Sequence, residues 1–222
     1  MFMVKKRIFL KVVALIWGIS GLVILAGVIW PIVSYKPSDL LSPIPLEKTN
    51  KVGSEEFDSV KASNWFIGGA SSDAFNLSKI SYYNISIPKL KIKDATVAIG
   101  GEDLSKNLIQ YPGTALPGKR GNSVIFGHSI LPIFYNPKEY LSIFSMLPTL
   151  KIGDEVLVDY DNVSFIYKVE SIFEVYPADI QVLEQDSSDS FLTLVTCVPP
   201  GDPRRPKRLI VRARVVPPDQ NS

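Results

Sequence analysis

The pattern of hydrophobic and polar positions divides the 222-residue chain into parts of different character. A continuous apolar run covers residues 8–30, a polar and proline-rich stretch follows over 31–78, and short apolar runs separated by turn residues fill 79–217. A long apolar run is typical of a membrane helix, whereas short alternating runs are typical of β-strands. The sequence therefore predicts an anchor, a linker and a β-domain, followed by a polar tail over 218–222.

The apolar run is long enough to cross a bilayer. At about 1.5 Å per residue, residues 8–30 match a hydrocarbon core about 30 Å thick. The only charge inside the run is Lys11, close to its start. A cleavable signal peptide would have a shorter apolar region and a small-x-small site, whereas this run continues through Ile29 and Trp30. We therefore favour an uncleaved transmembrane helix over a signal peptide.

The charges around the run predict its orientation. Residues 1–7 contain the basic cluster Lys5, Lys6 and Arg7, which by the positive-inside rule stays in the cytoplasm. We thus expect a single-pass protein of the cell membrane whose remaining chain lies outside the cell. These residues and Lys11 are four of the 24 Lys and Arg, which leaves 20 against 22 Asp and Glu. The slight basic excess belongs to the anchor and does not indicate nucleic-acid binding.

Residues 31–78 show neither a helical nor a strand period, and we interpret them as an extracytoplasmic linker. Three aromatic residues near its end, Trp65, Phe66 and Phe75, lie beside a glycine pair. They could pack on the domain or cover a groove, and packing into the core is the favoured interpretation.

Residues 79–217 predict a mainly β domain with little helix. Strand-like runs cover 85–92, 95–99, 123–126, 155–160, 164–176, 191–196 and 209–216. Asp161 and Asn162 are turn residues that predict a hairpin between two of these runs. Only 138–147 has helical spacing of its apolar residues. One closed barrel or sandwich with one or two short helices is therefore expected.

The chain has one cysteine and one histidine, and each closes a predicted strand. His128 ends the run 122–128, Cys197 ends the run 191–197, and a basic stretch containing Arg208 follows. A thiol becomes a nucleophile when a nearby cation lowers its pKa, and strand ends are rigid supports for such groups. This arrangement indicates a cysteine acyl-transfer enzyme. A lone cysteine is also often buried and inert, so a non-enzymatic tethered β-domain stays as the alternative.

Over residues 85–216 the chain resembles the sortases, which are membrane-anchored cysteine transpeptidases. The resemblance is carried by Thr-Leu-Val-Thr-Cys at 193–197, Arg-Leu-Ile-Val at 208–211 and Gly-Asn-Ser-Val-Ile-Phe-Gly-His at 121–128. The chain departs from the family at Phe126, where a small residue is usual, and in the proline-rich loop 198–203. Both departures concern substrate preference, and neither removes a catalytic group.

The resemblance implies a closed eight-stranded β-barrel that cuts a sorting signal similar to Leu-Pro-x-Thr-Gly after its threonine. Cys197 would attack the scissile carbonyl, His128 would act as acid and base, and Arg208 would hold the oxyanion or the substrate backbone. Thr196 and Phe126 are the expected substrate-binding residues. No metal or other cofactor is expected, and calcium dependence is left open.

The expected partners are surface proteins with a C-terminal sorting signal and an amine acceptor such as a cell-wall precursor. Pilin polymerisation is the alternative activity within the family. Protein anchoring is favoured because no Asp-Pro-aromatic triplet precedes His128 and the sequence ends in a polar tail. Papain-like peptidases have the opposite order of cysteine and histidine, and the Ser-x-Gly-Cys-x-Arg pattern of L,D-transpeptidases is absent.

The catalytic arginine has two rival positions, Arg204 and Arg205. Both lie in the proline-flanked loop, where we expect solvated side chains. Arg208 is preferred because it opens the apolar strand 209–216, in which its position is fixed.

The predicted orientation can be tested on intact cells. Protease added from outside is expected to digest the β-domain, because the basic cluster lies on only one side of the apolar run. The measurement is immunoblotting of the domain before and after lysis. Protection of the domain until lysis would contradict the orientation.

Overall fold

The structure is a computed structural model, and it describes residues 17, 20, 22, 60–76 and 81–217. Among these residues, no helix is long and apolar enough to span a membrane. The predicted span over 8–30 lies almost entirely outside the described part, as do residues 31–59 of the linker and the tail 218–222.

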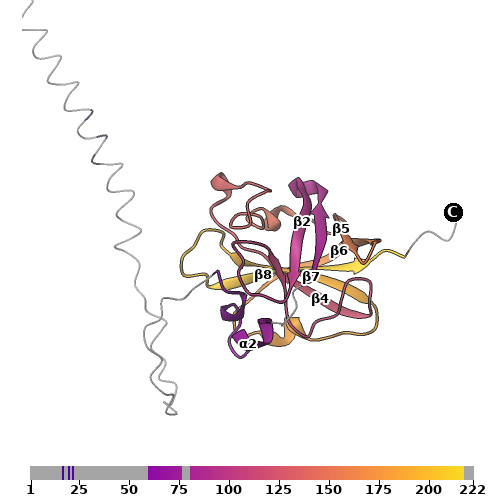
Figure 1. Cartoon of the computed structure of the whole chain (residues 1–222). Coiled ribbons are helices and arrows are strands. Elements are labelled where there is room, and N and C mark those ends of the chain that lie inside the picture. Colours follow the sequence, from indigo (N-terminus) through magenta and orange to yellow (C-terminus); the bar gives the residue numbers. More distant parts are fainter. Residues whose placement is uncertain (1–16, 18–19, 21, 23–59, 77–80, 218–222) are drawn as a thin grey trace, which may run out of the picture. The chain divides into compact units, whose positions relative to one another are not determined.

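Eight strands close into one barrel in the order β1-β2-β3-β4-β7-β8-β6-β5 (Figure 1). The prediction of a mainly β, closed eight-stranded barrel is confirmed. The strands are β1 (Ser81–Ile87), β2 (Ile92–Ile99), β3 (Leu108–Gln110), β4 (Gly121–Phe126), β5 (Glu155–Tyr160), β6 (Val163–Val175), β7 (Ser190–Val198) and β8 (Lys207–Val215). The short helices are η1 (Ala62–Asn64), α2 (Ser72–Phe75), η2 (Pro88–Leu90), η3 (Pro132–Phe134), η4 (Leu147–Thr149) and η5 (Ile180–Leu183).

Local turn chemistry explains the β5–β6 hairpin. Asp161 and Asn162 have φ angles of 52° and 60°, in the left-handed region that Asp and Asn tolerate better than most residues. The predicted hairpin is therefore confirmed. Strand β3 was not predicted, because three residues are too few to show a period.

The helix predicted over 138–147 is wrong. The segment forms a series of turns and ends in η4. Serine hydroxyls hold these turns: Ser142 Oγ donates to the carbonyl of Asn136 at 3.0 Å, and Ser145 Oγ accepts from the amide of Ile130 at 2.9 Å. Side-chain bonds of this kind compete with helical ones. The apolar spacing still has a structural reason, since Phe144 and Leu147 are buried in the core.

The barrel has two apolar clusters, one on each side of its wall. The cluster inside the barrel includes Ile125, Leu194 and Val211, and the outer cluster includes Phe126 and Val195. Successive strand residues point to opposite faces, so these strands must be apolar on both. Strands β4 and β7 are buried at every position. Apolar residues are therefore consecutive in them, as at Val124, Ile125 and Phe126, and the buried hydroxyl of Thr193 donates to the Asn122 side chain at 2.7 Å.

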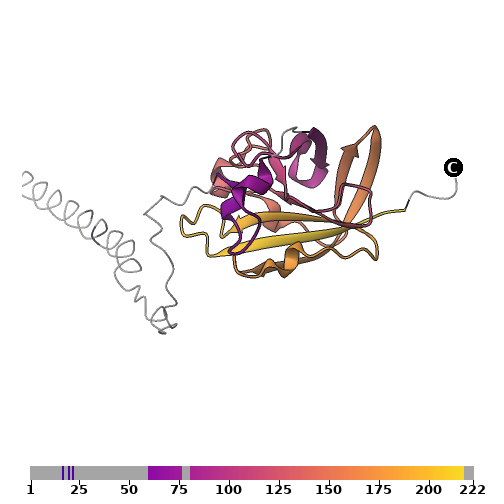
Figure 2. The same ribbon diagram turned by 60° about the horizontal axis from the view of Figure 1, so that its bottom comes forward.

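Residues 60–76 cover the outer cluster. The two views place this segment, which includes α2, beside the first part of β8 (Figures 1 and 2). Trp65, Phe66 and Phe75 are buried there, which confirms that they pack into a core. The folded domain therefore includes residues that we had assigned to the linker.

Replacing Phe75 tests whether this segment belongs to the fold. Phe75→Ala removes a fully buried ring and is expected to lower the free energy of unfolding by about 3–5 kcal/mol. Ile67→Ala is the control, because Ile67 lies in the same segment but is 73% exposed and should change stability little. Urea denaturation of the two variants measures both values. Equal stabilities would show that the segment is not part of the core.

Candidate active site

Strand pairing brings the three predicted catalytic residues to one edge of the barrel. Strands β4 and β7 are parallel neighbours, with Phe126 opposite Val195, so His128 and Cys197 follow at the same edge. Strand β8 is antiparallel to β7 and starts at this edge, where Arg208 is the direct partner of Cys197. Residues directly opposite each other point to the same face of a sheet. Cys197 and Arg208 therefore share the outer face.

Two hydroxyl groups fasten the strand ends to each other. Thr196 Oγ1 donates to the carbonyl of Gly127 at 2.8 Å, and Ser129 Oγ donates to the carbonyl of Cys197 at 2.8 Å. The amide of Gly127 also donates to the carbonyl of Val195 at 3.1 Å. These bonds fix the backbone on both sides of His128 against the backbone of Cys197.

The backbone of the following loop orients the imidazole. His128 Nδ1 donates to the carbonyl of Leu141 at 2.9 Å, which places the proton of the neutral ring on Nδ1. Burial lowers the pKa of His128, and the charge of Arg205 acts in the same direction. Hydrogen bonds with the backbone of Leu141 and Ser129 oppose this shift. The imidazole is therefore mainly neutral at pH 7.

The thiol is also neutral at rest. Burial raises the pKa of Cys197, and the charges of Arg208 and Arg205 only partly offset this effect. Cys197 is 5% exposed. Because the histidine pKa is lowered and the cysteine pKa is raised, the thiolate–imidazolium pair is a minor species at every pH.

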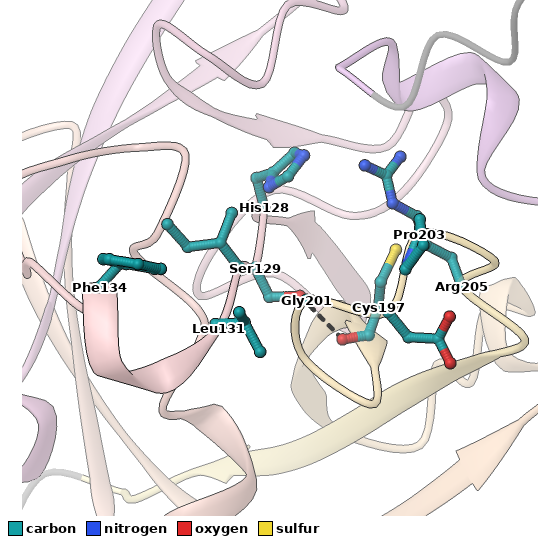
Figure 3. Close-up of a pocket in the computed structure, with 10 residues that line it drawn as sticks. His128, Ser129, Leu131, Phe134, Cys197, Gly201, Pro203 and Arg205 are labelled. Atoms are coloured by element: carbon teal, nitrogen blue, oxygen red, sulfur yellow. Dashed lines mark hydrogen bonds between the residues drawn. The ribbon is translucent and has the colours of Figure 1, made fainter. Parts of the chain in front are cut away.

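A cavity of about 390 Å³ gives access to the thiol (Figure 3). Its walls come from strand β7, the loop after His128 and the loop between β7 and β8. The residues that line it are His128, Ser129, Ile130, Leu131, Phe134, Cys197, Gly201, Asp202, Pro203 and Arg205. A nucleophile and a candidate general base thus border one open space.

Arg208, the strand partner of Cys197, does not line this cavity. Its side chain is 2% exposed and lies under Trp65. Nε donates to the carbonyl of Trp65 at 3.0 Å, and one terminal nitrogen donates to the carbonyls of Arg205 and Lys207 at 2.9 and 3.2 Å. The guanidinium lies 5.6 Å from the centre of the Trp65 ring, a cation–π contact.

The two rival arginines differ from each other. Arg204 is exposed and forms a two-point ion pair with Asp202, at 3.0 and 2.7 Å. Arg205 lines the cavity beside Cys197 and His128. The expectation that both are solvated loop residues is therefore wrong for Arg205.

The two expected substrate-binding residues lie outside the cavity wall. Thr196 is fully buried, and its hydroxyl is used in the bond to Gly127. Phe126 is fully buried in the outer cluster, where its ring stacks on Trp65 with centroids 5.2 Å apart. The Phe126 ring therefore packs against residues 60–76 in the outer cluster.

Several site residues were missed by the sequence analysis. Ser129 follows the histidine directly, so a polar residue next to a buried strand end was an available signal. The contributions of Trp65 and Leu141 are made by backbone carbonyls, which no side-chain pattern reveals. Within residues 60–76 and 81–217, no three metal-ligating side chains gather into a candidate metal site.

Comparison with known proteins agrees with this geometry. The family model described as the sortase domain matches residues 85–216, more than half of the chain. The chain belongs to the sortase family. Sortase A of Streptococcus agalactiae serotype III (strain NEM316) is 28% identical over 173 residues, covering 77% of this chain and 67% of that relative.

Sortase structures of different classes match the fold. A Clostridium perfringens Sortase D5 transpeptidase is 28% identical with a TM-score of 0.51, covering 61% of this chain and 78% of that one. Sortase C-1 from Actinomyces oris is 28% identical with a TM-score of 0.53, covering 61% and 73%. These likenesses support the sortase fold and leave the class within the family open.

The pKa of Cys197 can be followed through its reaction with iodoacetamide, which consumes only the thiolate. We expect the rate to rise with pH around a higher midpoint in the folded protein than in the same protein unfolded in urea, because burial raises the cysteine pKa. At pH 7 the folded protein should react more slowly. A midpoint equal to or below that of the unfolded chain would contradict the described burial of the thiol.

Proposed function

We propose that this sortase cleaves a C-terminal sorting signal similar to Leu-Pro-x-Thr-Gly and joins the shortened protein to an amine on the cell surface. The observation that carries the proposal is the parallel pairing of β4 with β7, which sets His128 beside Cys197 at the cavity. Family membership supports transpeptidation as the reaction class.

The first half-reaction forms a thioester. The Cys197 proton moves to His128, and the thiolate attacks the carbonyl carbon after the threonine of the signal. As the tetrahedral intermediate collapses, the carbon–nitrogen bond breaks and the His128 imidazolium gives its proton to the leaving amine. The shortened protein is then bound to the sulfur of Cys197.

The second half-reaction reverses these roles. Neutral His128 takes a proton from the incoming amine as its nitrogen attacks the thioester carbonyl. The carbon–sulfur bond breaks, and the thiolate of Cys197 leaves and recovers the proton from His128. The first half-reaction therefore starts from the neutral resting pair described above, and the second regenerates it.

Arg208 is the proposed oxyanion or backbone ligand. All of its hydrogen bonds within the described residues are made to peptide carbonyls, which are the groups that a bound peptide presents. Substrate contact requires that the residues covering the guanidinium move, because the Arg208 side chain is 2% exposed. This contact is compatible with the shared outer face of Cys197 and Arg208.

Anchoring of surface proteins is favoured over pilin polymerisation. The Asp-Pro-aromatic triplet of pilus-type lids is absent before His128. Residues 60–76 cover the outer face with Trp65 and Phe66 instead. The expected acceptor is accordingly a cell-wall precursor amine, and the enzyme is proposed to act at the membrane.

A peptide-library assay with the folded protein tests the proposal. Cleavage of Leu-Pro-x-Thr-Gly peptides and transfer to an added amine are expected, and both should fall to background in Cys197→Ala because the chain has no second thiol. Mass spectrometry of the products measures cleavage, transfer and the trapped thioester. Ser188→Ala is a matched control, because Ser188 lies outside the cavity wall. Activity above trace level in Cys197→Ala would overturn the nucleophile assignment.

A further inference from the structure

The side chain of Arg205 enters the active-site cavity, and nothing in the reaction described so far uses it. In Figure 3 its guanidinium faces the imidazole of His128, and the sulfur of Cys197 lies below the guanidinium. A molecule in the cavity that reaches the sulfur therefore meets both a general base and a guanidinium.

The backbone holds Arg205 in this position at some cost. Its φ angle is 46°, in the left-handed region that a bulky residue rarely adopts. The amide of Arg205 donates to the carbonyl of Asp202 at 3.1 Å, and its own carbonyl accepts from Arg208 at 2.9 Å. Unfavourable backbone conformations are often found at functional sites. Here the conformation directs the carbonyl to Arg208 while the side chain lines the cavity.

Arg205 also lacks a counter-ion in the described part of the chain. The nearby carboxylate of Asp202 is taken by Arg204, which binds both of its oxygens. No hydrogen bond and no ion pair of the Arg205 guanidinium occurs within residues 60–76 and 81–217. A guanidinium has five N–H donors in a planar fork that matches a carboxylate. Arg205 is thus free to take an anionic group from outside the protein.

The positive charge of Arg205 is not explained by activation of Cys197 and His128. Arg205 lowers the pKa of Cys197, which favours the thiolate, but it also lowers the pKa of His128, which disfavours the imidazolium. The two pKa shifts therefore have opposite effects on the formation of the thiolate–imidazolium pair. The Arg205 guanidinium also repels an acceptor whose amine is protonated. An anionic group on that acceptor would offset the repulsion.

We propose that Arg205 is a specificity-determining residue that binds a carboxylate carried by the amine acceptor. This inference rests on the proposed transpeptidation. The acceptor places its carboxylate on Arg205 and its neutral amine between His128 and the thioester on Cys197. Leu131 and Phe134, which line the same cavity, contact the carbon chain between the two groups.

The carboxylate site can be tested without any substrate. Iodoacetate and iodoacetamide both alkylate the single thiol with loss of iodide, and they differ in the carboxylate. In the intact protein, Arg205→Ala is expected to lower the ratio of the iodoacetate rate to the iodoacetamide rate by about threefold or more. A changed thiol pKa affects both reagents equally, so the ratio reports only the carboxylate. The decrease should shrink at high salt.

Arg120→Ala is the control. It removes the same charge from an exposed side chain outside the cavity wall, and it should leave the ratio within experimental error of the unmodified protein. Arg204 is unsuitable as a control, because its removal would release the Asp202 carboxylate, which lines the cavity. Arg205→Lys keeps the charge and should restore part of the ratio. An unchanged ratio in Arg205→Ala, or an equal decrease in Arg120→Ala, would overturn the carboxylate site.

A transfer assay then tests the identity of the ligand. With a donor peptide cleaved by the protein, the KM for glycylglycine is expected to rise severalfold in Arg205→Ala, and the KM for glycylglycine amide to stay unchanged. Equal effects on both acceptors would overturn the assignment to the acceptor. A lowered alkylation ratio in a protein that transfers no peptide would refute the proposed function while leaving the carboxylate site in place.

Discussion

The parallel pairing of β4 with β7 is the constraint on which the site depends. Both strands are buried on both faces, and neighbouring residues such as Leu194 and Val195 pack into the inner and the outer cluster in turn. If the register of β7 shifted by one residue, the side chain of Cys197 would point into the barrel. The side chains of Leu194 and Thr196 would then point to the outer cluster instead. The same apolar packing that stabilises the barrel therefore fixes which way the sulfur points and which residue of β8 lies opposite it.

The buried charge of Arg208 ties the first part of the domain to this site. A cation that is 2% exposed is costly unless polar groups surround it, and among the described residues it is met by backbone carbonyls and the ring of Trp65. Residues 60–76 thus have two roles, because they complete the outer apolar cluster and supply a ligand to the guanidinium. Changes in this segment will affect stability and the site together.

The sequence predicted the features that depend on local patterns. Strand runs, the hairpin at Asp161 and Asn162, and the placement of His128 and Cys197 at strand ends all follow from periodicity and turn chemistry. The predicted helix over 138–147 failed because its backbone amides, such as those of Ser142 and Ser145, donate to carbonyls three residues back in turns that serine hydroxyls support. The cavity position of Arg205 depends on a left-handed backbone, and the covering of Arg208 depends on a carbonyl 143 residues away. Neither the left-handed backbone nor the distant carbonyl contact can be recognised from a pattern in the amino-acid sequence.

The bonds that join the strand ends connect residues that are 68 and 69 positions apart. Contacts of such long range close large loops and form slowly during folding, since the entropy of loop closure must first be overcome. Arg208 joins them only when β8, the last strand, is in place. A partly folded chain therefore carries the thiol without the histidine and the arginine beside it. Assembly of the site is coupled to closure of the barrel and cannot precede the pairing of the last strand.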